Sequence, residues 1–117
     1  MSRPPLNPPS LSRQSKGQYY EQQARRFLEQ QGLLFVTANY RCRQGEIDLI
    51  MREHQTLVFV EVRYRASRDY GGALSSVTPA KQQKIRYTAR YFLLNQQITV
   101  ALPACRFVFF SFYHGLQ

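Results

Sequence analysis

Apolar residues recur at helical spacing near the start of the chain. Tyr20, Ala24, Phe27 and Leu28 fall at positions i, i+4, i+7 and i+8, so they would lie along one face of a helix. Gly32 follows as a typical helix stop. The pattern predicts a first helix over residues 18–31.

A second helix is predicted over residues 78–95, where the start signal is clear. Thr78 can cap the free N–H groups of the first turn, and Pro79 suits the first helical position. The apolar positions that follow at helical spacing are Ile85, Ala89, Phe92 and Leu93.

The remaining apolar runs are short and favour strands. We expect strands over residues 33–38, 46–51, 57–65, 98–102 and 106–113. A basic turn is expected over residues 39–45, a polar hairpin tip over 53–56 and a loop over 66–77. The order α-β-β-β-α-β-β predicts an α/β fold in which two helices flank a central mixed sheet.

Alternation within the hairpin predicts which side chains share a face. Glu46, Asp48 and Ile50 would lie on one face of the first strand, away from Ile47 and Leu49. On the partner strand, the same face would carry Phe59, Glu61 and Arg63. A four-residue turn at 53–56 sets position 50 opposite 59, 48 opposite 61 and 46 opposite 63.

This register places the carboxylates of Asp48 and Glu61 side by side, an arrangement that normally destabilises a hairpin. A divalent cation would explain the pair, because Mg²⁺ binds one or two carboxylates together with waters and phosphate oxygens. An ion-pair network explains it too: Glu46 would pair with Arg63, while Asp48 or Glu61 is solvated or pairs with Arg65. Geometry alone leaves both interpretations open.

Net charge points to a polyanionic partner. The chain has 16 Lys and Arg against seven Asp and Glu, a formal charge of +9, which favours nucleic acid but also suits a surface that only promotes solubility. The candidate phosphate contacts are Arg41, Arg43, Arg65, Lys81 and Lys84, and Arg86 and Arg90 extend the charge along the second helix. Glu21, at the border of the first helix's apolar stripe, could reach the sheet or stay exposed.

Other features constrain compartment and domain organisation. Residues 1–16 carry four prolines, Arg3, Arg13 and Lys16 and no acids, so we expect a flexible basic tail before a single domain over residues 17–117. The tail lacks the apolar core of a signal peptide, and no apolar run is long enough to cross a membrane. Cys42 and Cys105 form no metal-binding motif. We therefore expect a cytoplasmic protein without membrane association.

Two strings of residues carry a family resemblance. Residues 45–50 read GEIDLI and residues 59–65 read FVEVRYR. Together they resemble the GEIDLI…FVEVKxR signature of the bacterial YraN-like proteins, which belong to the restriction-endonuclease-like (PD-(D/E)xK) superfamily and are similar to archaeal Holliday-junction resolvases. The resemblance extends over residues 17–112 and includes Glu21, residues 39–41 and Lys81.

The resemblance implies a restriction-endonuclease-like fold and a metal-dependent nuclease site for DNA, including branched DNA. Asp48, Glu61 and the carbonyl of Val62 would bind Mg²⁺ or Mn²⁺, with Glu21 and Glu46 as supporting acids. The ion would polarise the scissile phosphate and lower the pKa of an attacking water. Cutting both strands of a duplex would favour a homodimer.

The chain departs from the family pattern at two positions. Arg63 replaces the motif lysine, and because an arginine stays charged it can bind phosphate but cannot act as a base. Val108 stands where the family commonly has an aspartate. A non-catalytic nucleic-acid-binding module and a protein-interaction domain are therefore alternatives to an active nuclease.

Overall fold

The computed structural model of the chain describes residues 13–65, 78–96 and 104–113. The elements in these ranges are α1 (Arg13–Gln30), β1 (Leu34–Cys42), β2 (Gly45–Glu53), β3 (Thr56–Arg65), α2 (Pro79–Asn95) and β4 (Cys105–Tyr113). This order confirms the predicted α/β class. The predicted loop over 66–77 and strand over 98–102 lie outside the described residues, as do residues 1–12 of the predicted tail.

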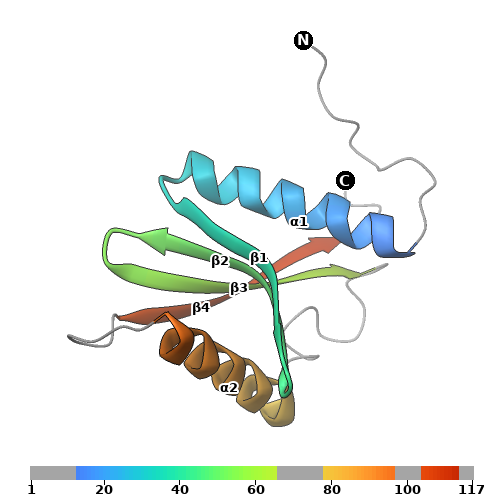
Figure 1. Cartoon of the computed structure of the whole chain (residues 1–117). Coiled ribbons are helices and arrows are strands. Elements are labelled where there is room, and N and C mark those ends of the chain that lie inside the picture. The colour runs from blue at the N-terminus through green and yellow to red at the C-terminus, as the bar shows by residue number, and fades with distance from the viewer. Residues whose placement is uncertain (1–12, 66–77, 97–103, 114–117) are drawn as a thin grey trace.

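The four described strands form one mixed sheet in the order β1-β2-β3-β4 (Figure 1). β1, β2 and β3 pair antiparallel, whereas β4 pairs parallel with β3. A parallel neighbour requires a crossover connection, and α2 lies within the segment that makes it. This topology is consistent with a restriction-endonuclease-like fold.

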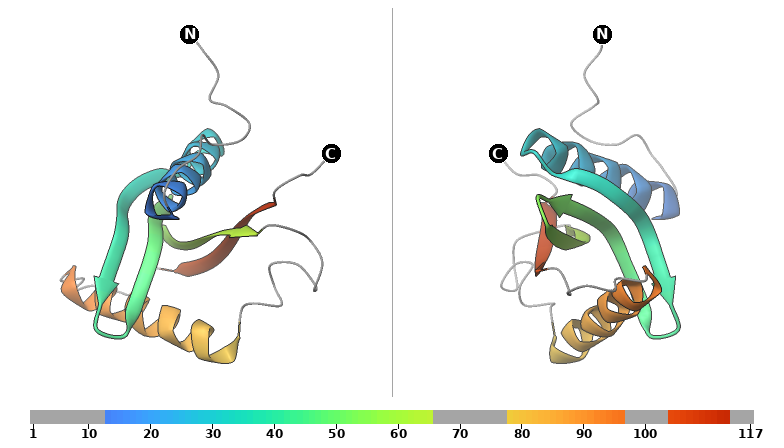
Figure 2. Two further views of the ribbon diagram at one scale, coloured as in Figure 1. Left: turned by 90° about the vertical axis from the view of Figure 1, so that its right-hand side faces the viewer. Right: turned by 60° about the vertical axis from the view of Figure 1, so that its left-hand side comes forward.

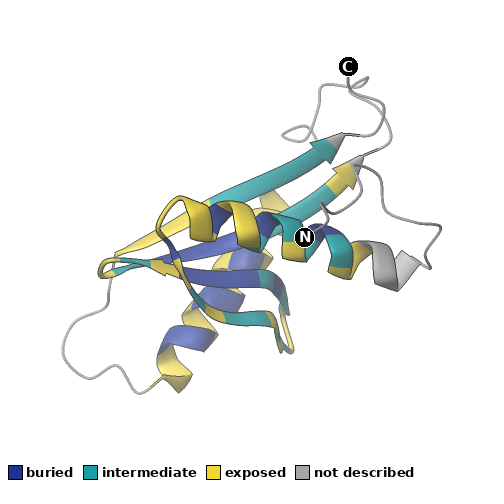
Figure 3. Cartoon of the chain, turned by 90° about the horizontal axis from the view of Figure 1, so that it is seen from above, coloured by how far each residue is buried: buried dark blue, intermediate teal, exposed yellow. Residues whose placement is uncertain are grey.

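The two helices cover opposite faces of the sheet, as Figure 2 makes clear. Each encloses its own cluster of buried side chains. The cluster under α1 contains Ala24, Leu28, Leu33, Leu49, Met51, Val58 and Val60. The cluster under α2 contains Ile47, Ile50, Leu57, Phe59, Ile85, Ala89, Phe92 and Leu93. Burial is deepest in β2 and β3, which are the central strands, and weaker in β4 (Figure 3).

The start of α2 and the tip of the hairpin confirm the predictions made from local sequence. The hydroxyl of Thr78 accepts a hydrogen bond from the backbone N–H of Lys81 at 3.2 Å, and Pro79 begins the helix. In the hairpin, Glu53 pairs with Thr56 and Ile50 with Phe59, the register expected for a tip at 53–56. Both features depend on residues close in sequence, for which turn and cap chemistry is decisive.

The structure corrects two predicted boundaries. α1 begins at Arg13, five residues before the predicted start, although this added stretch includes Gly17. β1 continues to Cys42, so the predicted turn over 39–45 is wrong and the connection to β2 is only residues 43–44. Tyr40 extends the strand because its ring packs edge-on against Phe92 of α2, with 5.1 Å between the ring centroids.

No helix within the described residues has both the length and the apolar character needed to cross a membrane.

Candidate metal centre and nucleic-acid interface

Asp48 lies where the ladder between β2 and β3 ends. The last regular pair is Leu49 with Val60, and the next contact is made by a side chain: the backbone N–H of Val62 donates to Oδ2 of Asp48 at 2.7 Å. From Asp48 back toward Gly45, β2 curves away from β3 and toward α2 (Figure 2). In an antiparallel pair the N–H and C=O of one residue face the same neighbour, so the carbonyl of Val62 also faces the Asp48 side.

The predicted alternation of side chains along β2 is wrong near Asp48. Ile47 and Ile50 both pack in the cluster under α2, although they are three residues apart and strict alternation would separate them. Leu49 and Met51 remain in the cluster under α1. A local irregularity in β2 therefore accompanies the end of the ladder, and Asp48 is located at it.

Three predicted site acids converge there from three different elements. Asp48 on β2 lies close enough to Glu21 on α1 and to Glu61 on β3 for its charge to raise the pKa of both carboxyl groups. The structure thus brings together residues that are up to 40 positions apart in the sequence (21 and 61).

Burial makes these acids hard to ionise. The pKa of Glu61 is raised to about 8, first by burial and then by the charge of Asp48, while Arg63 opposes the shift. The pKa of Glu21 is raised to about 7, again by burial and then by Asp48, against a hydrogen bond from Asn39. Burial also raises the pKa of Asp48, although the Val62 N–H stabilises its ionised form. A bound cation would stabilise the ionised carboxylates and so lower these pKa values.

Glu46 lies at the border of this group. Its Oε2 accepts a 2.7 Å hydrogen bond from Nε of Arg41, its register partner on β1. The suggested ion pair between Glu46 and Arg63 is therefore replaced by one with Arg41. The charge of Glu46 still contributes to the raised pKa values of Glu21 and Asp48, so Glu46 belongs to the surroundings of the site. We call Glu21, Glu46, Asp48 and Glu61 the acidic cluster.

Arg63 faces the cluster without a hydrogen-bond acceptor for its Nε. This atom is buried and has no partner among the described residues, and the same holds for Oγ of Ser111, the register partner of Arg63 on β4. Buried donors of this kind normally have a partner.

The predicted phosphate contacts are spread over several elements. Arg41 lies near the end of β1 and Arg43 in the short connection to β2, and both are exposed. Lys84 is beside that connection, since its Cβ is 3.6 Å from the position that a Cβ on Gly45 would occupy. Lys81 is exposed in the first turn of α2, and Arg65 ends β3, where only its backbone is described.

Asn39 was not predicted as a site residue. It has a φ of 53°, lies across from Asp48 between the pairs Ala38–Leu49 and Tyr40–Ile47, and its side chain opposes the rise in the pKa of Glu21. A pocket of about 350 Å³ between α1 and β1 opens beside it, and both Glu21 and Asn39 line it. The available signal was the residue type, because asparagine tolerates positive φ better than most residues.

The donor set fits a hard divalent cation. Among the described residues, no group of three or more His, Cys, Asp or Glu side chains is arranged to hold a metal ion. Asp48 and Glu61 nevertheless supply two adjacent carboxylates, with the Val62 carbonyl facing the same side. Mg²⁺ usually binds one or two carboxylates and completes its shell with waters and substrate phosphates. Such a sparse donor set would not suit a structural zinc ion.

Comparison with known proteins assigns the chain to a family. The model of the Uncharacterised protein family UPF0102 matches residues 20–110. The chain belongs to the UPF0102 family. A UPF0102 protein from Aeromonas hydrophila is 56% identical over 98 residues, which cover 84% of this chain and 75% of that protein. UPF0102 protein YraN from Salmonella newport is 52% identical over 102 residues, covering 87% and 78% respectively.

A third relative, UPF0102 protein HEAR0176 from Herminiimonas arsenicoxydans, is 48% identical over 102 residues, covering 87% of this chain and 80% of the relative. Membership of UPF0102 confirms the YraN-like resemblance carried by the GEIDLI and FVEVRYR strings. The span matched by the family model contains every predicted site residue from Glu21 to Lys84.

Proposed function

We propose that this UPF0102 protein is a metal-dependent nuclease-type domain that binds DNA and hydrolyses its phosphodiester backbone. The observation that carries the proposal is the position of Asp48 and Glu61, two interacting carboxyls enclosed where β2 and β3 separate. Buried acids with strongly raised pKa values are typical of functional sites. The ion pair suggested between Glu46 and Arg63 is not among those present in the described residues, where Glu46 pairs with Arg41 instead.

Asp48, Glu61 and the Val62 carbonyl would hold Mg²⁺ or Mn²⁺, which would polarise the phosphate and activate water when bound. Glu21, with a pKa of about 7, can accept or release a proton at neutral pH. Arg63 would donate a guanidinium N–H to a phosphate oxygen. Arg41, Arg43, Arg65, Lys81 and Lys84 would contact backbone phosphates, which fix the position of the DNA without reading its sequence.

A second candidate is a nucleic-acid-binding module without turnover. It is favoured by Arg63, whose guanidinium cannot take the proton of an attacking water as the family's motif lysine could. In this case the basic residues would still contact the DNA backbone, and DNA affinity would depend on salt but not on a divalent metal.

A cleavage assay separates the two candidates. Linear, flap and four-way-junction DNA would be incubated with the protein in Mg²⁺, in Mn²⁺ and in EDTA. Asp48→Ala should lose more activity than the roughly 10- to 100-fold typical of removing a group outside the first ligand shell. Glu53→Gln is the matched control, because Glu53 is an acid of the same strand that pairs with Arg106 near the hairpin tip.

Metal-dependent cleavage that is lost in Asp48→Ala and kept in Glu53→Gln would support the nuclease. Higher cleavage activity in Arg63→Lys than in the wild type would show that Arg63 limits the rate of cleavage. No cleavage on any substrate, together with binding that EDTA leaves unchanged, would contradict the nuclease and support the binding module.

A further inference from the structure

The exposed side of α2 carries positive charge without any acid. The helix contains Lys81, Lys84, Arg86 and Arg90, and no Asp or Glu occurs in its 17 residues. None of the ion pairs present in the described residues involves α2. Lys81 even lies in the first turn, at the positive end of the helix dipole, where a cation is unfavourable. This uncompensated charge would be stabilised by an anionic partner.

Aromatic rings lie next to these cations on the same exposed surface. Tyr87 and Tyr91 are one helical turn apart and are 48% and 47% exposed. Arg86 and Arg90 form a parallel stripe with the same spacing and are also exposed. The opposite side of the helix is buried against the sheet, so nothing in the core requires these two tyrosines. We call Gln83, Arg86, Tyr87, Arg90 and Tyr91 the outer face of α2.

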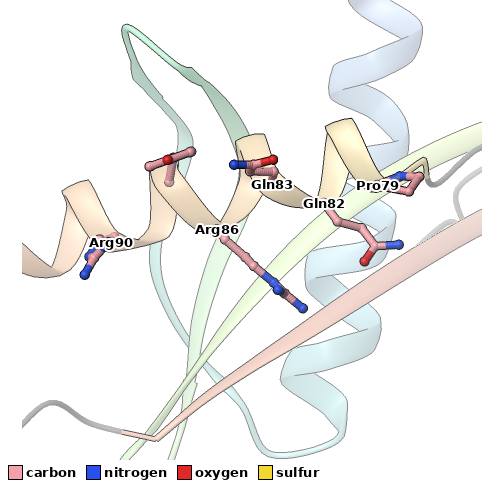
Figure 4. A pocket seen from close by; sticks show the side chains of 6 residues that line it. Pro79, Gln82, Gln83, Arg86 and Arg90 are labelled. Atoms are coloured by element: carbon pink, nitrogen blue, oxygen red, sulfur yellow. The ribbon is translucent and has the colours of Figure 1, made fainter.

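A pocket of about 560 Å³ is associated with this surface and is lined by Pro79, Gln82, Gln83, Arg86, Tyr87 and Arg90 (Figure 4). The side chains of Gln82 and Arg86 extend toward β4, and both also line a smaller pocket with Phe107 and Phe109 of that strand. The hollow is therefore bordered by guanidinium and amide groups and by a tyrosine ring. Those groups match phosphate, base edges and base faces respectively.

We propose that the outer face of α2 is a binding site for single-stranded nucleic acid. Bases would stack on Tyr87 and Tyr91, while Arg86 and Arg90 contact the phosphates between them. Exposed rings beside cations suit unpaired bases, because the faces of bases in a duplex are already covered by their neighbours. This inference rests on the nucleic-acid-binding part of the proposed function and is independent of cleavage, since α2 lies on the opposite face of the sheet from α1, which carries Glu21.

A second copy of this chain is a poorer occupant of the same surface. In a two-fold symmetric contact each outer face would meet its own copy, so Arg86 and Arg90 would face equal charges. Like charges across an interface oppose association. No acid on α2 could compensate for them.

The test measures affinity for a fluorescent single-stranded oligonucleotide and for the matching duplex by anisotropy, in EDTA so that no cleavage occurs. Each of Tyr87→Ala and Tyr91→Ala should weaken single-strand binding at least about fivefold, and the duplex much less. Tyr87→Phe and Tyr91→Phe should restore it, because stacking requires the ring and not the hydroxyl. Arg86→Gln and Arg90→Gln should each lower the salt dependence, by about 0.7 in the log–log slope per lost phosphate contact.

Arg26→Gln and Phe27→Ala are the matched controls, because both residues are exposed on α1 and Phe27 has the same 48% exposure as Tyr87. They should leave single-strand affinity unchanged. The proposal is overturned if the wild type does not bind single strands, if the α2 variants bind as well as the wild type, or if the α1 variants lose as much. It is also overturned if the tyrosine variants convert a dimer to a monomer without changing single-strand affinity. Because binding is measured in EDTA, these results do not depend on whether Asp48 supports cleavage.

Discussion

The two ends of the β2–β3 hairpin lie in the same pair of strands but bury opposite kinds of side chain. Near the tip, Ile50 faces Phe59 and Met51 faces Val58, and all four side chains are at most 1% exposed. At the other end the ladder stops and carboxyl groups are enclosed instead.

The apolar end of the hairpin contributes to stability, whereas the acidic end carries the candidate site. Burying apolar side chains stabilises the fold by roughly 25 cal/mol for each Å² removed from water. Enclosing carboxyls is unfavourable, which is why the pKa values of Glu61 and Glu21 are raised. The apolar end therefore holds the acidic end in an arrangement that its own charges oppose. That division of roles is expected at a binding site for a cation.

The largest expected effect concerns the apolar end. Phe59→Ala should lower the free energy of unfolding by about 3–5 kcal/mol, because it opens a cavity between β3 and α2. Urea unfolding followed by circular dichroism measures the change. Leu94→Ala is the control: Leu94 is 69% exposed on α2, so its loss should be within about 0.5 kcal/mol. Equal losses in the two variants would refute the assigned core.

A smaller effect of opposite sign is expected at the acidic end. The folded-state pKa of Glu61 is about 8, above its ordinary value of 4.5. Between these values the folded state binds more protons than the unfolded state, so the stability of the metal-free protein should fall as pH rises from 5 to 8. Glu61→Gln should remove much of this slope and raise stability at pH 8 on the order of 1 kcal/mol.

Thermal unfolding in EDTA at pH 5, 6, 7 and 8 measures that slope. Glu21 should leave a residual pH dependence in the Glu61→Gln variant, since the pKa of Glu21 is also raised, to about 7. Glu53→Gln should keep the wild-type slope, because Glu53 forms an ion pair with Arg106 and lies outside the cluster. A metal-free wild type that becomes more stable from pH 5 to 8 would show that the acids are not enclosed as described.

Local chemistry allowed much of the fold to be predicted. The Thr78–Pro79 start of α2 and the register near the hairpin tip depend on neighbouring residues, and both are confirmed. The end of β1 was predicted wrongly because Asn39 and Arg41 resemble turn residues. Their strand conformation depends on Tyr40 packing against Phe92, a contact with a distant part of the chain.

The candidate site was predicted only in part. The family strings identified Asp48 and Glu61, and the structure brings them together with Glu21. The predicted alternation of side chains is wrong at Asp48. It assumed a regular strand, but here the Asp48 side chain accepts the hydrogen bond from the Val62 N–H in place of a backbone carbonyl. The ion pair between Glu46 and Arg41 was not predicted, because Arg41 was assigned to a turn and not to a strand beside Glu46.

Binding of Mg²⁺ to the protein alone tests the central claim most directly. Thermal unfolding at pH 8 would be followed over a Mg²⁺ titration for the wild type, Asp48→Asn, Glu61→Gln and Glu53→Gln. A ligand that binds only the folded state raises the melting temperature with concentration, so the wild type and Glu53→Gln should shift upward while Asp48→Asn and Glu61→Gln shift little. A wild type insensitive to Mg²⁺, or an Asp48→Asn variant that shifts as far as the wild type, would contradict a cation site between Asp48 and Glu61.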